Sequence, residues 1–102
     1  MKPIDLTPYK AAMDAFHDLP KGVPSLVDLG PTKGVWSIYY WNGLLNQCVS
    51  QFDDGRVVRY QEGDEDMLPT RDEDIEPTAW NEIFESLDEM IAIDIETEKA
   101  NT

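Results

Sequence analysis

The chain has 102 residues, a net charge of −13 and 41% hydrophobic residues, enough for the core of one domain. This composition excludes a collagen-like fibre and a disulfide scaffold, and no run approaches the ~18 apolar residues of a membrane helix. A single cysteine, Cys48, and the lack of a signal-peptide pattern predict a cytoplasmic protein.

The first predicted element is a helix over residues 8–18. Thr7 is expected to cap it, and Pro8 fits its first turn, where a missing N–H costs nothing. Apolar residues then recur at helical spacing on one face: Tyr9, Ala12, Met13, Phe16 and Leu19. Residues 20–34 are rich in Pro and Gly and predict a connector, with a brief edge strand at 25–29.

A three-stranded antiparallel meander is predicted next, with strands at 35–41, 44–52 and 56–61. The first of these reads VWSIYYW, a β-branched and aromatic run that is typical of strands. Asn42-Gly43 and Asp54-Gly55 each predict a two-residue turn, because these residues accept the positive φ of the favoured hairpin turns.

Two-residue turns would sort the strand side chains onto two faces of the sheet. The more apolar face, which we expect the helices to cover, holds Trp36, Ile38, Tyr40, Leu45, Gln47, Val49, Gln51, Val58 and Tyr60. The other face mixes aromatic and polar groups and is expected to be an exposed contact surface. It holds Val35, Ser37, Tyr39, Trp41, Asn46, Cys48, Ser50, Phe52 and Arg59.

Residues 62–76 predict a solvated loop, since eight of these fifteen residues are acidic. An amphipathic helix is expected over 78–95, with a tail at 96–102 that frays. Its apolar stripe consists of Trp80, Ile83, Phe84, Leu87, Met90, Ile91 and Ile95. The predicted fold class is therefore one α+β domain over 1–102, ordered αβββα, with both helices on one sheet face.

The charge is unevenly placed along the chain. Residues 1–52 hold four acids and four bases, whereas residues 53–102 hold the other 17 acids and four bases. Direct binding to nucleic acid or to an anionic membrane surface is disfavoured, because both need a basic footprint. A basic protein is the expected partner, since complementary fields speed encounter.

Catalytic patterns are not found in the sequence, so we expect no enzyme activity and no cofactor. Cys48 and His17 are the candidates for a thiol–base pair, but nothing in their spacing brings them together. One histidine and one cysteine cannot build a zinc site. The acidic triplets do not fit a calcium loop, since position six counted from Asp64 is Pro69 rather than Gly.

The acidic half suggests a non-enzymatic inhibitor that blocks a basic nucleic-acid-binding protein by mimicking DNA or RNA. Duplex DNA carries one charge per ~1.7 Å of axis, and closely spaced carboxylates can imitate that density. Glu82, Glu85 and Glu89 would form a helical row. The full set of predicted partner-binding residues is Glu62, Asp64, Glu65, Asp66, Asp72, Glu73, Asp74, Glu82, Glu85, Glu89, Tyr39 and Trp41.

Other interpretations stay open. The order αβββα is shared with double-stranded-RNA-binding domains, whose basic contact residues have no counterpart here. In size, acidity and order the chain also resembles some phage-encoded anti-CRISPR and DNA-mimic proteins, which implies an anti-CRISPR or anti-restriction role. An immunity protein against a nuclease toxin fits equally well. So does an adaptor that binds through the aromatic sheet face or the last helix and uses its acids for solubility. The sequence allows a monomer or a homodimer.

Overall fold

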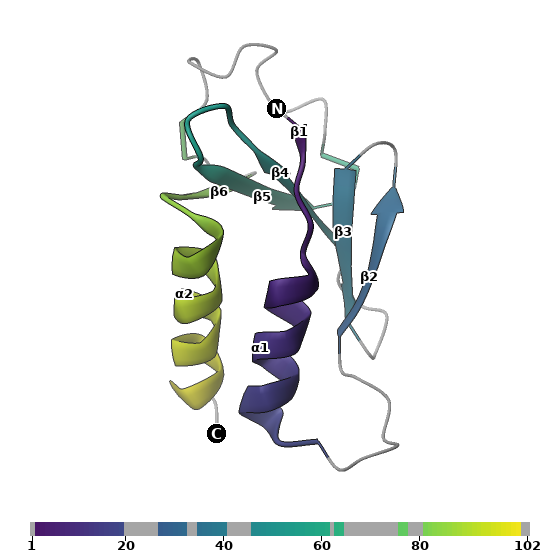
Figure 1. Ribbon diagram of the computed structural model, residues 1–102. Coiled ribbons are helices and arrows are strands. Elements are labelled where there is room, and N and C mark those ends of the chain that lie inside the picture. Colours follow the sequence, from purple (N-terminus) through teal and green to yellow (C-terminus); the bar gives the residue numbers. More distant parts are fainter. Residues whose placement is uncertain are drawn as a thin grey trace.

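Two helices lie side by side against one face of an antiparallel sheet (Figure 1). The computed structural model describes residues 2–19, 27–32, 35–40, 46–61, 63–64, 76–77 and 81–100. Their elements are, in chain order, β1 (Lys2–Pro3), α1 (Thr7–His17), β2 (Val27–Thr32), β3 (Val35–Tyr40), β4 (Asn46–Gln51), β5 (Val57–Gln61), β6 (Asn81–Phe84) and α2 (Leu87–Ala100).

The sheet has six strands among the described residues, so the predicted three-stranded αβββα arrangement is wrong. Its order is β2-β3-β4-β5-β6, and β1 pairs with β4 outside this path. The predicted meander forms the middle, β3-β4-β5. The edge strand expected at 25–29 is a full strand, β2, which pairs along β3 from Val27↔Tyr40 to Thr32↔Val35. Tertiary pairing thus extends the sheet beyond the runs with the strongest strand composition.

Helix α1 lies where the apolar spacing predicts it. The expected Thr7 cap is wrong, because Leu6 is the N-cap residue and no side chain caps the helix; Thr7 donates instead to Asp5, just before the helix. The Asp5 carboxylate accepts the Thr7 backbone N–H at 2.9 Å and the Thr7 hydroxyl at 2.6 Å. The helix ends at His17, and the C-cap residue Asp18 adopts the left-handed conformation with φ +49° and donates its N–H to the Ala15 carbonyl at 3.2 Å.

The predicted helix over 78–95 is wrong at both ends. Residues 81–84 form strand β6, which pairs with β5, and α2 begins only at Leu87. Ser86 caps this start: its hydroxyl accepts the Glu89 N–H at 3.1 Å, and the Glu89 carboxylate accepts the Glu85 N–H, one residue before the cap, at 2.5 Å, in a variant of the capping box. At the other end α2 runs to Ala100, through most of the expected frayed tail.

The register between β4 and β5 is one residue away from the predicted one. Phe52 pairs with Arg56, donating its N–H to the Arg56 carbonyl at 2.8 Å, so the loop has three residues rather than two. Gly55 takes the positive φ of +95° that such a loop needs. A shift of one residue moves every β5 side chain to the opposite face. Arg59 therefore lies on the helix-covered face, and Val58 and Tyr60 lie on the other.

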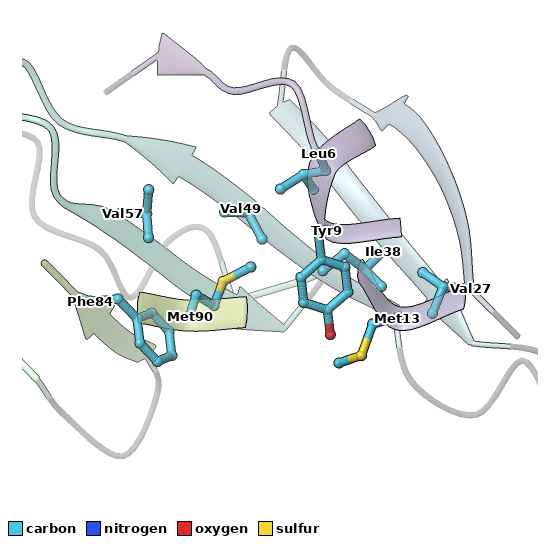
Figure 2. Packing of buried hydrophobic residues seen from close by; sticks show 9 residues of the cluster. All are labelled: Leu6, Tyr9, Met13, Val27, Ile38, Val49, Val57, Phe84 and Met90. Atoms are coloured by element: carbon cyan, nitrogen blue, oxygen red, sulfur yellow. The ribbon is translucent and has the colours of Figure 1, made fainter. Parts of the chain in front are cut away.

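The main core fills the space between the helices and the sheet. Figure 2 shows Tyr9 and Met13 of α1 and Met90 of α2 with Ile38, Val49 and Val57 of the sheet. Leu6, Val27 and Phe84 complete this buried cluster. Ile38 and Val49 lie on the face that the sequence assigned to the helices.

The second sheet face is also buried, so the expectation of an exposed contact surface is wrong for its described members. Cys48, Phe52, Val58 and Tyr60 form a second buried cluster, and Ser37 and Ser50 are fully buried as well. Apolar packing accounts for this, because the register shift adds Val58 and Tyr60 to this face. Trp41 lies outside the described residues, and of Tyr39 only the backbone in β3 is described.

Replacing Ser86 by Ala removes the hydroxyl that accepts the Glu89 N–H. We expect the free energy of unfolding to fall by about 1 kcal/mol, the usual value for loss of a helix cap. Urea unfolding measures the change. Ser50→Ala is the matched control, because the Ser50 hydroxyl is buried and has no hydrogen-bond partner among the described residues. It should leave stability unchanged or raise it. Equal losses in both variants would contradict the cap.

Asp5→Asn tests the Asp5–Thr7 contact at the start of α1 through pH. The hydroxyl and the N–H of Thr7 hold the pKa of Asp5 below its ordinary value of 3.8. A lowered pKa means that the carboxylate stabilises the folded protein above about pH 4, and that this contribution disappears as the pH falls further. The stability difference between wild type and Asp5→Asn should therefore shrink below pH 4 in urea unfolding. A difference that stays constant down to pH 2.5 would contradict this.

Candidate functional site

One buried arginine ties both helices to the sheet. Arg59 of β5 is only 7% exposed and points to the helix side, where its Nη1 donates to Asp94 of α2 at 2.5 Å. Tyr9 of α1 donates its hydroxyl to the same carboxylate oxygen at 2.6 Å. On the strand beside it, Glu82 accepts from Nε and Nη2 of Arg59, both at 3.2 Å. We call these four residues the Arg59 cluster.

The charge of Arg59 is fixed by its surroundings. Burial alone would lower the pKa of Arg59, but the hydrogen bonds and charges of Asp94 and Glu82 outweigh burial and raise that pKa above its ordinary value. The guanidinium is therefore a permanent cation. It also stacks on the Phe84 ring, with its central carbon 5.1 Å from the ring centroid.

A cavity of about 180 Å³ adjoins the Arg59 cluster. Its lining consists of Tyr9, Met13, Arg59, Asp94, Thr97 and Glu98. Tyr9 and Arg59 in this lining both donate to Asp94, which indicates a structural cluster rather than a ligand site.

The structure separates the predicted row of Glu82, Glu85 and Glu89. Glu82 lies on β6 and binds Arg59, Glu85 lies in the turn before α2, and Glu89 lies in the first turn of α2. The row was wrong because residues 81–84 are a strand. Glu85 and Glu89 remain exposed, as are Asp88 and Glu96.

Among the other predicted contact acids, Asp64 belongs to the described residues. Asp64 is half-buried and donates its N–H to the Gln61 carbonyl at 3.0 Å. The remaining acids of the predicted site lie outside the described residues: Glu62, Glu65, Asp66, Asp72, Glu73 and Asp74.

The candidates for catalysis lie apart in the fold. Cys48 is buried in the second sheet face, where its Sγ is 3.7 Å from the Ser37 hydroxyl. His17 ends α1, which packs on the opposite face, and its ring meets that of Phe16 edge-on at 5.2 Å. Among the described residues, no three His, Cys, Asp or Glu side chains gather as metal ligands.

The outer side of α2 carries a feature that the sequence pattern did not reveal. A shallow groove of about 490 Å³ runs along it, lined by Glu89, Ala92, Ile93, Glu96, Thr97 and Ala100. Ile93, at 42%, is the one large apolar side chain that is exposed in the described part of the chain. The signal was present in the sequence, because Ile93 falls outside the inward stripe of Leu87, Met90 and Ile91.

No protein-family model matches the chain, and searches of curated proteins and of solved structures find no similar protein. Neither of the two described helices is long and apolar enough to cross a membrane. Function is therefore inferred from the chemistry of the surface.

Asp94→Asn and Glu82→Gln remove the same charge from the same arginine and should differ in effect. The Asp94 side chain is 13% exposed and that of Glu82 is 57% exposed. Breaking the buried pair should lower the free energy of unfolding by about 3 kcal/mol, whereas loss of the exposed pair should cost less than about 1 kcal/mol. Guanidinium unfolding measures both. An equal loss of unfolding free energy in both variants would contradict the larger role assigned to the buried Asp94–Arg59 pair.

Proposed function

We propose that this protein is a non-enzymatic inhibitor that binds a basic nucleic-acid-binding protein and blocks it by charge mimicry. The targets that fit are proteins with a basic channel for DNA or RNA, such as a restriction enzyme or a CRISPR effector. A phage or another mobile element would use such an inhibitor against host defence.

The excess of acids in residues 53–102 carries the proposal. This half of the chain has 17 acids and four bases. Three of those bases already bind carboxylates within the described structure: Arg56 binds Asp54, Arg59 binds Asp94 and Glu82, and Lys99 binds Glu96. Within the described residues these pairs engage four acids, and the sequence of this half provides one further base, Arg71, for the other 13.

Exposed carboxylates at this density can compete with phosphates for a basic surface. Arginine and lysine bind carboxylate and phosphate oxygens by the same charge-assisted hydrogen bonds. Of the 14 residues of α2, five are acidic and one is basic, and Asp94 alone among those five binds Arg59. An adaptor that binds through the aromatic sheet face stays the alternative; Phe52 of that face is buried, and the side chains of Tyr39 and Trp41 lie outside the described residues.

Neutralising two acids of the predicted contact surface tests the proposal. We expect the double variant Asp72→Asn/Asp74→Asn to bind its partner about tenfold more weakly, because each exposed ion pair contributes up to about 1 kcal/mol. The tagged protein is incubated with a nuclease-treated extract of the source cell. The measurement is the amount of partner that stays bound as the salt concentration rises.

The matched control is Asp18→Asn/Asp53→Asn, which changes the net charge equally at two exposed sites outside the proposed surface. Asparagine is well tolerated at the left-handed position of Asp18. This control should keep the affinity of the wild type. Equal retention by both double variants would contradict charge mimicry through the predicted surface.

A further inference from the structure

The outer side of α2 presents one continuous row to the solvent. Glu89, Ile93, Glu96 and Ala100 follow one another at spacings of four, three and four, so they lie along one line of the helix. Ala92 and Thr97 flank this row and complete the groove. Isoleucine and alanine thus alternate with glutamates over three helical turns.

The inward side of α2 packs on the core, whereas the apolar members of this row are exposed. Of its two glutamates, Glu89 accepts the Glu85 N–H and Glu96 pairs with Lys99, and both stay exposed to solvent. Met90 is fully buried, and Leu87, Ile91 and Ile95 pack against the main core. Asp94 turns to the Arg59 cluster. Thr97 donates its hydroxyl to the Ile93 carbonyl at 2.9 Å, within the same helix. One side of α2 therefore packs on the core, and the other side faces the solvent.

The negative charge of the exposed side of α2 determines which kind of partner can bind there. A second copy of this chain would bring a net charge of −13 toward an equal charge, and Glu89 and Glu96 of both copies would meet. A helix with basic residues beside an aliphatic stripe has the complementary pattern. The small side chains of Ala92 and Ala100 allow close approach of another helix backbone.

We propose that the groove on α2 docks a basic amphipathic helix of the partner protein. Aliphatic residues of that helix pack on Ile93, Ala92 and Ala100, and its lysines or arginines pair with Glu89 and Glu96. This is helix-in-groove recognition, with anchors at positions i, i+3, i+4 and i+7. The inference rests on the proposed function for the basic character of the partner and adds the contact that positions it.

A synthetic peptide tests the groove without the natural partner. The probe is a fluorescent 14-residue peptide of leucine and lysine with its leucines on one helical face, and its control has the same composition in scrambled order. We expect the patterned peptide to bind the wild type by fluorescence anisotropy. The scrambled peptide should bind at least about tenfold more weakly, because it cannot bury an aliphatic stripe.

Ile93→Glu separates apolar docking from simple charge attraction. The substitution adds an acid, so pure attraction to a basic peptide would stay equal or increase, whereas loss of the apolar contact should weaken binding at least about tenfold. The matched control is Ala11→Glu, which adds the same charge at an exposed position of α1 and should bind as wild type does. Ile93→Gln provides a neutral variant, and circular dichroism confirms that each variant is folded.

Three results would overturn the inference: equal or tighter binding by Ile93→Glu, equal binding of the scrambled peptide, or a wild-type dimer that Ile93→Glu converts to monomer. The proposed function is tested separately by capture from the source cell. Undiminished capture of a nucleic-acid-processing protein by Ile93→Glu would contradict the groove alone. Patterned peptide binding without such a captured protein would contradict the proposed function alone.

Discussion

A guanidinium buried between a sheet and two helices must find carboxylates, and this requirement organises the molecule. Arg59 meets it with Asp94 from α2 and Glu82 from β6, and Tyr9 from α1 binds the same Asp94 carboxylate. Burying charges is expensive, and the attraction between them repays this only with good geometry and further hydrogen bonds. The cluster supplies both, so it fixes how α2 sits on the sheet, with Met90 packed into the apolar core.

Fixing α2 in this way also decides which of its acids face the solvent. Asp94 is used inside the fold, whereas Asp88, Glu89 and Glu96 lie on the exposed side of the helix. Because α2 is held with Asp94 facing the sheet, Ile93 lies at the surface between Glu89 and Glu96. The internal ion pair and the proposed binding surface are thus two sides of one helix. A change at Asp94 is expected to disturb recognition indirectly, by loosening the element that presents the acids.

The sequence predicted the parts of the fold whose signals are local. The apolar spacing around Tyr9 and Met13 placed α1, and the β-branched and aromatic run placed β3. Strand β6 was missed because Ile83 and Phe84 also fit the helical spacing of the residues that follow. The Ser86–Glu89 capping box, Ser-x-x-Glu, was the available signal for the true start of α2. The β5 register depended on one additional turn residue, which the Asp54-Gly55 dipeptide does not specify.

The candidate site was less predictable, because its geometry depends on contacts between distant residues. An acid at Asp94, set in the inward stripe of α2, required a basic partner, but nothing local identified Arg59. The excess of acids itself was readable from composition. Which of these acids form ion pairs inside the protein could be seen only in the structure.

The most direct test of charge mimicry is competition for the partner. The partner is captured with tagged protein after nuclease treatment, released by salt, and loaded with a fluorescent duplex DNA or RNA at low salt. We predict that added protein displaces the nucleic acid at about one molecule per partner, and that displacement weakens steeply as salt rises. A partner that binds this protein and nucleic acid at the same time, with an affinity that salt does not change, would contradict the account.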